Sequence, residues 1–245
     1  MLLAWIVLFS VIGSIGALAG AALMLSFPDR IRDSLLPALL GYATGTLLGA
    51  AFLGMIPTAL AGQTPIAISS TVLAGIVVFF ILEKLVIWRH AHDRNADSAI
   101  ASGPLILIGD AFHNFVDGIV IAGAFLTSVP LGISVSLAVI AHEIPQEVGD
   151  FAILLDSGYS KTRALALNLL SSLSTLPGAL IGYFFLAEAM AFVPFILALS
   201  AASFIYIAIA DLVPGLTRQR DFRVSLIQLL LLFSGIATIA LFHVG

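Results

Sequence analysis

Two apolar stretches decide the fold: LILIGDAFHNFVDGIVIAGAFL at residues 105–126 and LGISVSLAVIAHEIPQEVGDFAILL at residues 131–155. Each is as long as the roughly 20 residues that a helix needs to cross a bilayer. Both nevertheless carry carboxylates and a histidine, and neither carries a lysine or an arginine. A charge in hydrocarbon is costly, so such groups face a bundle interior, a partner or an ion path. The simplest counter-charge for these acids is a cation that comes from solution.

The composition is that of a protein almost wholly within a membrane. Of the 245 residues, 60% are hydrophobic and only 10% are charged, whereas soluble domains carry roughly a quarter charged residues. This predicts a single transmembrane domain over residues 1–245. The chain starts with the apolar run MLLAWIVLF and lacks the basic region of a signal peptide there. We therefore expect a retained first span in a multi-pass protein of the cell or inner membrane.

Two further observations exclude other classes of protein. The sequence has no cysteine, which excludes disulfides, thiolate metal sites and cysteine nucleophiles. Its ten lysines and arginines are spread over short connections, so a nucleic-acid partner is not expected.

Apolar runs predict an all-α bundle of eight transmembrane helices. Their expected ranges are 2–26, 36–61, 66–88, 104–127, 130–155, 164–186, 190–213 and 224–243. The connections between helices 2 and 3, 4 and 5, and 6 and 7 carry no basic residue. All ten positive charges then fall on one side, which is predicted to be cytoplasmic, with both termini extracytoplasmic. Residues 89–103 form the expected cytoplasmic loop, in which His90 and His92 are either solvated or bind a regulatory metal.

Helical spacing gathers the polar residues of the fourth predicted span. His113 and Asp117 are four residues apart and share a helical face, with Asp110 one turn earlier and Asn114 beside them. In the fifth span, a second set repeats at the same spacing, comprising His142, Gln146 and Asp150 on one stripe and Glu143 and Glu147 on the next. Imidazole, carboxylate and amide groups at one depth suit zinc, with iron, manganese and cadmium as alternatives.

The segments DAFHNFVDGIVIAGAF (110–125) and HEIPQEVGDFAILLDSG (142–158) resemble the fourth and fifth spans of the ZIP family of divalent metal transporters. The likeness extends to GYATGTLLGAAFLGMIP, NLLSSLS and FIYIAIADLVPGL in the second, sixth and seventh spans. It implies eight helices with outward termini, a homodimer, and transport of zinc or a related ion toward the cytoplasm. The metal would be the substrate, with no cofactor and no enzymatic activity.

By position, the resemblance implies a primary metal site and a second site beside it. The primary residues would be His113, Asp117, His142 and Gln146; Asn114 and Glu143, sharing Gln146, would line the second. This chain also departs from the family pattern, having Gln146 where many relatives have histidine, and Gly54, Thr58 and Gly215 where relatives carry ligand or acidic groups. The departures predict one main ion and a selectivity shifted away from zinc.

The expected route takes the ion inward past Asp150 or Glu147. Asp110 and Asp150 lie nearer the ends of their spans and are either entry or exit groups or simply reach headgroup water. Asp211 either joins the inner vestibule or ends its helix. Since metal ligands must be deprotonated, uptake should fall at low pH.

Two alternative functions are weaker. An intramembrane metalloprotease requires HExxH, but position 146 is glutamine and Pro145 is expected to interrupt the helical turn. A proton-coupled carrier of an organic solute would need polar or basic groups at mid-span, and none is evident.

Overall fold

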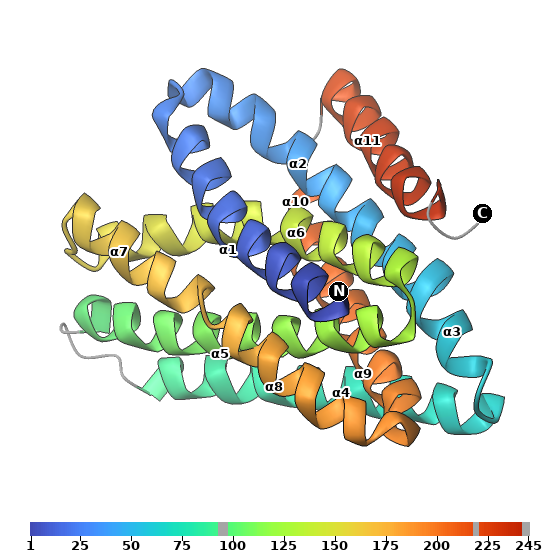
Figure 1. Ribbon diagram of the computed structural model, residues 1–245. Helices are drawn as coiled ribbons and strands as arrows, with labels where there is room; N and C mark the ends of the chain where they lie inside the picture. The colour runs from blue at the N-terminus through green and yellow to red at the C-terminus, as the bar shows by residue number, and fades with distance from the viewer. Residues whose placement is uncertain (93–97, 218–220, 242–245) are drawn as a thin grey trace.

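The computed structural model describes the backbone of residues 1–92, 98–217 and 221–241, and every regular element in these ranges is a helix (Figure 1). The first four predicted spans correspond to α1 (Leu2–Ser26), α2 (Asp29–Gly49) continued by η1 (Ala50–Met55) and α3 (Ile56–Leu60), α4 (Pro65–His92), and α5 (Ser98–Thr127). The last four correspond to α6 (Val129–Asp156), α7 (Lys161–Ser172) with α8 (Thr175–Glu188), η2 (Met190–Phe192) with α9 (Val193–Tyr206), η3 (Ile207–Leu212) and α10 (Val213–Thr217), and α11 (Phe222–Leu241).

The predicted all-α membrane bundle is confirmed. Seven helical segments among the described residues are long and apolar enough to cross a membrane, and the stretch Pro65–Ile81 of α4 is a shorter apolar helix. Figure 1 shows that consecutive spans run in alternating directions: the α1–α2 and α6–α7 turns lie on the left, and the α3–α4, α5–α6 and α8–α9 turns on the right. The two groups of connections therefore lie at opposite ends of the bundle.

The sixth span is not the single helix that the sequence predicts. α7 ends at Ser172 and α8 begins at Thr175, with a turn between them. Pro177 explains the break, because its missing N–H leaves the carbonyl of Leu173 without the usual helical donor. The break lies against α5, where the Ser174 hydroxyl donates to the Ala111 carbonyl at 2.6 Å.

Spans 2 and 7 each contain a π-helical stretch that the sequence analysis did not predict. η1 is followed two residues later by Pro57, and η3 by Pro214. A proline removes the hydrogen bond to the carbonyl four residues earlier, and π-type hydrogen bonding accommodates the disturbance at each place.

Two other local expectations are corrected. α6 continues without a break through Pro145, so this proline does not interrupt the helical turn. Helix also occupies residues 89–92 and 98–103 of the predicted loop. A helix can continue into a polar segment outside the lipid bilayer, because its internal hydrogen bonds satisfy the backbone N–H and C=O groups both in lipid and in water.

The interior is organised around α5 and α6. α5 packs extensively on α6 and α8, while α1 covers α6 and α4 covers α9. The largest core cluster includes Phe125, Leu131, Val135 and Phe204. These close contacts place the polar faces of α5 and α6 toward each other inside the bundle.

Candidate metal centre

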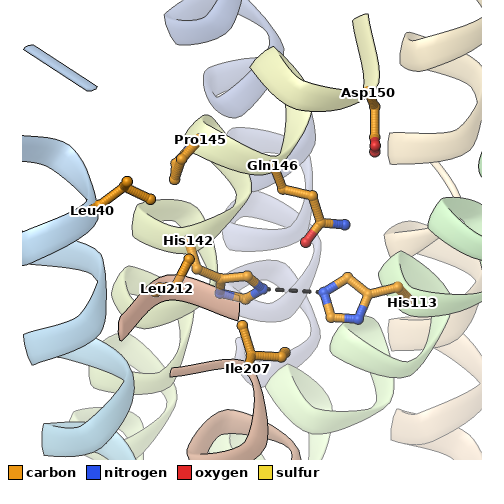
Figure 2. A pocket seen from close by; sticks show the side chains of 8 residues that line it. All are labelled: Leu40, His113, His142, Pro145, Gln146, Asp150, Ile207 and Leu212. Carbon is orange, nitrogen blue, oxygen red and sulfur yellow. Dashed lines mark hydrogen bonds between the residues drawn. The ribbon is translucent and has the colours of Figure 1, made fainter. Parts of the chain in front are cut away.

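A pocket of about 410 Å³ reaches the facing histidines of α5 and α6. Figure 2 shows the side chains that line it: Leu40, His113, His142, Pro145, Gln146, Asp150, Ile207 and Leu212. Gln146 and Asp150 lie one and two helical turns beyond His142, in the direction of the connection that carries Lys161 and Arg163. The pocket therefore runs from the histidine pair toward the basic end of the bundle.

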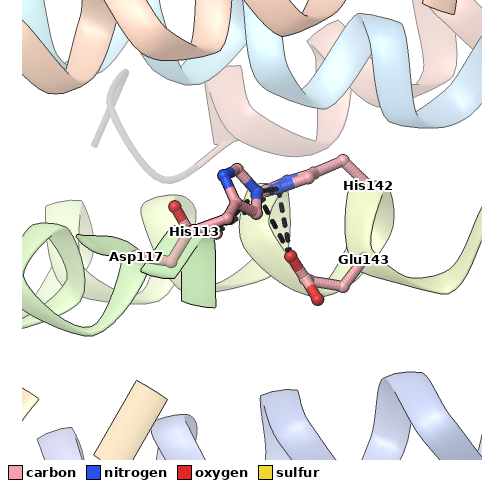
Figure 3. A group of neighbouring side chains, drawn as sticks. All are labelled: His113, Asp117, His142 and Glu143. Carbon is pink, nitrogen blue, oxygen red and sulfur yellow. Dashed lines mark hydrogen bonds and ion pairs between the residues drawn. The ribbon is translucent and has the colours of Figure 1, made fainter. Parts of the chain in front are cut away.

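Four side chains converge at the inner end of this pocket (Figure 3). The Nε2 atoms of His113 and His142 lie 3.2 Å apart. A carboxylate oxygen of Glu143 lies 3.4 Å from each of them. An oxygen of Asp117 lies 3.3 Å from Nε2 of His142 and 3.8 Å from Nε2 of His113. Two helices thus bring together two nitrogen and two oxygen atoms of the kinds that could ligate a metal ion.

These separations fit a tetrahedral metal ion. Zinc bonds of about 2.0–2.1 Å at tetrahedral angles place neighbouring ligand atoms about 3.3 Å apart. Four of the five separations given above lie between 3.2 and 3.4 Å. The longer one, between His113 and Asp117, joins residues on adjacent turns of α5 and needs only a small side-chain adjustment.

The Nδ1 atom of His142 holds the imidazole ring so that Nε2 faces the cluster. Nδ1 lies 3.0 Å from the Ala138 carbonyl, and a carbonyl can only accept, so the proton is assigned to Nδ1. This leaves the lone pair on Nε2 facing the cluster, the arrangement that metal-binding histidines commonly show.

The cluster is shielded from solvent and short of hydrogen-bond donors. Asp117, His142 and Glu143 are buried, while His113 is part-exposed at the pocket. Oδ2 of Asp117 and both oxygens of Glu143 lack a hydrogen-bond donor. Unsatisfied buried carboxylate oxygens are energetically costly, and a divalent ion would satisfy them.

The two predicted amide residues are both tied to Asp110. Asn114 donates to Oδ1 of Asp110 at 2.9 Å, and Gln146 donates to the same atom at 3.2 Å. The Asn114 carbonyl oxygen accepts from Thr175 at 3.0 Å. In Figure 2 the Gln146 oxygen turns toward the histidines. Gln146 can therefore offer an oxygen to the centre, whereas the Asn114 amide is committed to its neighbours.

Glu147 lies on the adjacent face of α6 and contacts the broken sixth span. Its Oε1 accepts from Ser172 at 2.7 Å, and its backbone carbonyl accepts from Asn168 at 3.3 Å. Single ligand oxygens of Asp110, Glu143 and Glu147 lie within 4.8 Å of one another. Glu143 thus borders both groups of acids.

The remaining predicted residues lie elsewhere. Asp150 lines the pocket nearer its basic end. The side chains of His90, His92 and Asp211 lie outside the described part of the structure. In the second span, the Thr58 hydroxyl donates to the Gly54 carbonyl at 2.7 Å, a local helical bond.

Sequence reasoning missed three polar residues of the sixth span: Asn168, Ser172 and Thr175. All three are buried and contact Glu147 or Asn114. Their positions at i, i+4 and i+7 in an otherwise apolar span were the available signal, because this spacing places them on one helical face.

The fold is that of a multi-pass membrane protein, and the cluster is a group of four side chains that could hold a metal ion. The family description "ZIP Zinc transporter" matches residues 89–243, and the chain belongs to this family. It is 35% identical over 224 residues to zinc transporter ZIP13 of Pongo abelii, covering 84% of this chain and 66% of that protein. It is 32% identical over 263 residues to zinc transporter ZIP13 of Homo sapiens, covering 84% of this chain and 70% of that protein.

A further relative is zinc transporter zipt-7.2 of Caenorhabditis elegans, 29% identical over 263 residues and covering 82% of this chain. The alignments span 57% of that protein and just under two thirds of the Pongo abelii protein.

Proposed function

We propose that this chain carries Zn²⁺, or a related divalent ion, across its membrane toward the side that bears the basic connections. The observation that carries the proposal is the converging set of His113, Asp117, His142 and Glu143, whose spacing matches a tetrahedral ion. The naming of its relatives as zinc transporters supports the same substrate. The metal is cargo, and the family is one of transporters rather than enzymes.

Charge balance explains how the site tolerates a dipositive ion at membrane depth. Two carboxylates and two neutral imidazoles neutralise one divalent ion, so the loaded site has no net charge to be desolvated. The ion exchanges its water for these four groups, and Gln146 lines the pocket beside them. Asp110, Glu147 and Asp150 then offer oxygen ligands on the way to the basic end.

The proposal extends to the whole chain. Residues 1–245 act as one transporter domain in the cell or inner membrane, with both termini on the outer side. A homodimer follows from the resemblance to the family. All four ligands come from one protomer, so each protomer carries its own route.

The test is uptake of radioactive zinc into proteoliposomes, with manganese, iron and cadmium as competitors. We expect saturable uptake by the wild type and its loss when Asp117→Ala and His142→Ala are combined. Glu188→Gln, at an exposed acid far along α8, is the control and should transport normally. Unchanged uptake by the folded double variant would refute the site.

A further inference from the structure

A series of side-chain hydrogen bonds joins the broken sixth span to the pocket. It begins at Thr175, the first residue of α8, which is buried and contacts α5. The Thr175 hydroxyl bonds to the Asn114 amide oxygen, and Asn114 donates to Oδ1 of Asp110. Gln146 of α6 donates to the same carboxylate oxygen and lines the pocket beside the histidines. The series therefore crosses from α8 through α5 to α6.

The first bond of the series has a fixed direction. The Thr175 hydroxyl oxygen lies 3.0 Å from the Asn114 amide oxygen and 2.9 Å from the Ser172 carbonyl oxygen, and both of these oxygens only accept. A hydroxyl has a single hydrogen to donate. The Ser172 carbonyl also accepts from Ser14 of α1 at 2.8 Å, so it does not depend on Thr175. The hydrogen of Thr175 is therefore available to Asn114.

The Asn114 amide is fixed at its other end as well. Its nitrogen lies 2.9 Å from Oδ1 of Asp110 and 3.2 Å from the Asp110 carbonyl oxygen. Turning the amide over would set its oxygen against these two acceptors and its nitrogen against the hydrogen of Thr175. Asn114 thus keeps its nitrogen toward Asp110, and the atom that it meets there must be an acceptor.

The same acceptor determines how the Gln146 amide is turned. Nε2 of Gln146 lies 3.2 Å from Oδ1 of Asp110, so the amide oxygen must point the other way. Figure 2 shows this oxygen turned toward His113 and His142. The two ends of an amide are nearly equal in size, but only the oxygen can accept a hydrogen bond or face a cation favourably. A reversed Gln146 would direct N–H groups at an ion held by the histidines.

We propose that Thr175 is a positioning residue of the metal centre, and that it fixes the Gln146 amide with its oxygen toward the ion. It acts through the hydrogen bonds of Asn114 and Asp110. The proposal rests on the proposed transport function and gives the sixth span a part in binding the ion. The histidine cluster itself comes from α5 and α6, and its members are His113, Asp117, His142 and Glu143.

Zinc binding to the purified full chain tests the proposal, with the affinity measured by competition against a chelating dye. Thr175→Val keeps the side-chain shape but removes the hydroxyl. We expect it to weaken zinc binding about tenfold, as is typical for residues that orient metal ligands. Thr175→Ser keeps a hydroxyl and should bind zinc as the wild type does. Ser174→Ala is the matched control, because it removes a hydroxyl bond from the same turn to the Ala111 carbonyl of α5 and should also bind normally.

A double variant separates positioning from a general loss of structure. If Thr175 acts through the Gln146 amide, Thr175→Val should not weaken zinc binding further in a Gln146→Ala protein. The same loss of affinity in both backgrounds would overturn the proposal, and so would wild-type affinity in the folded Thr175→Val protein. Thr175→Ala also lacks the hydroxyl and takes the place of Thr175→Val in both measurements if the valine protein does not fold.

Zinc uptake by the same proteins distinguishes this proposal from the transport proposal. Zinc binding that depends on Thr175, together with no uptake by the wild type, would defeat transport alone. Uptake by the wild type, together with a zinc affinity that Thr175→Val leaves unchanged, would defeat the positioning role alone.

Discussion

At the scale of single residues, His142 shows how the fold fixes the orientation of a buried imidazole. The Ala138 carbonyl fixes the proton on Nδ1, and the Phe204 ring lies edge-on with its centroid 5.8 Å from that of the imidazole. Both contacts limit rotation of the ring, so Nε2 stays directed at Asp117 and Glu143. The presence of an imidazole within this span was readable from the sequence, whereas its tautomer depends on a backbone carbonyl that the fold positions.

Gln146 is the residue at which selectivity should be adjustable. Its oxygen turns toward the histidines while its nitrogen is held by Asp110. Gln146→His replaces a weak oxygen ligand by imidazole, which favours zinc over manganese. We expect the ratio of zinc to manganese affinity to rise about tenfold, equivalent to about 1.4 kcal/mol, in competition uptake assays.

The control for this change is Gln63→His, which adds a histidine in the α3–α4 turn and should leave the ratio unaltered. A ratio that stays at the wild-type value in Gln146→His would mean that position 146 does not contact the transported ion.

At the scale of helices, the site depends on how closely α8 approaches α5. A Cβ added at Gly118 would lie 2.0 Å from the Thr175 carbonyl oxygen, and one at Gly178 equally close to the Phe115 carbonyl. Small residues permit such approach between membrane helices. The approach lets Thr175 reach Asn114 and Ser172 reach Glu147.

Gly118→Ala should therefore separate α5 from α8. Overpacking a tight interface costs about 1–3 kcal/mol, so we expect a lower unfolding temperature in detergent and reduced zinc uptake. Gly109→Ala is the matched control on the same helix, because a Cβ there meets nothing within 4 Å. Equal thermal stability of the two variants would contradict the conclusion that Gly118 is needed for the close packing of α5 against α8.

The helices also show where sequence reasoning succeeds and where it stops. Apolar length located every span, and the i, i+4 rule correctly brought His113 beside Asp117. The contact of Gln146 with Asp110 joins residues 36 positions apart, and no local pattern contains it. The apolar segment of the sixth span is long enough for one continuous helix, and that length was the basis of the prediction. The missing N–H of Pro177 instead breaks the helix at residues 173–174.

At the scale of the whole molecule, the distribution of basic residues predicts its orientation. Because the chain has no cysteine, single-cysteine variants can report which face is outside. Ala191→Cys lies in the connection before α9, and Thr162→Cys lies at the start of α7; both positions are exposed. We expect an impermeant thiol reagent to label Ala191→Cys in intact cells and Thr162→Cys only after permeabilisation. The reverse pattern would invert the proposed direction of transport.

In the described conformation the pocket connects the histidine cluster with the basic end of the bundle, and apolar side chains close the cluster off at the other end. The pocket passes Gln146 and Asp150, whereas buried apolar residues such as Val135 and Phe125 fill the bundle on the opposite side of the histidines. A transported ion must at some stage meet an opening to that side, so at least one other arrangement of the helices is required.

Accessibility of the pocket should therefore depend on the side from which it is probed. In inverted vesicles we expect an impermeant thiol reagent to label Leu40→Cys, because Leu40 lines the pocket, and zinc to slow this labelling by occupying the adjoining site. Val135→Cys, fully buried in the apolar layer, should remain unlabelled under the same conditions. Labelling of Leu40→Cys only in right-side-out vesicles would place the opening on the opposite face. Labelling at equal rates from both sides would mean that the described arrangement, open toward the basic end, is not the one that predominates in the vesicles.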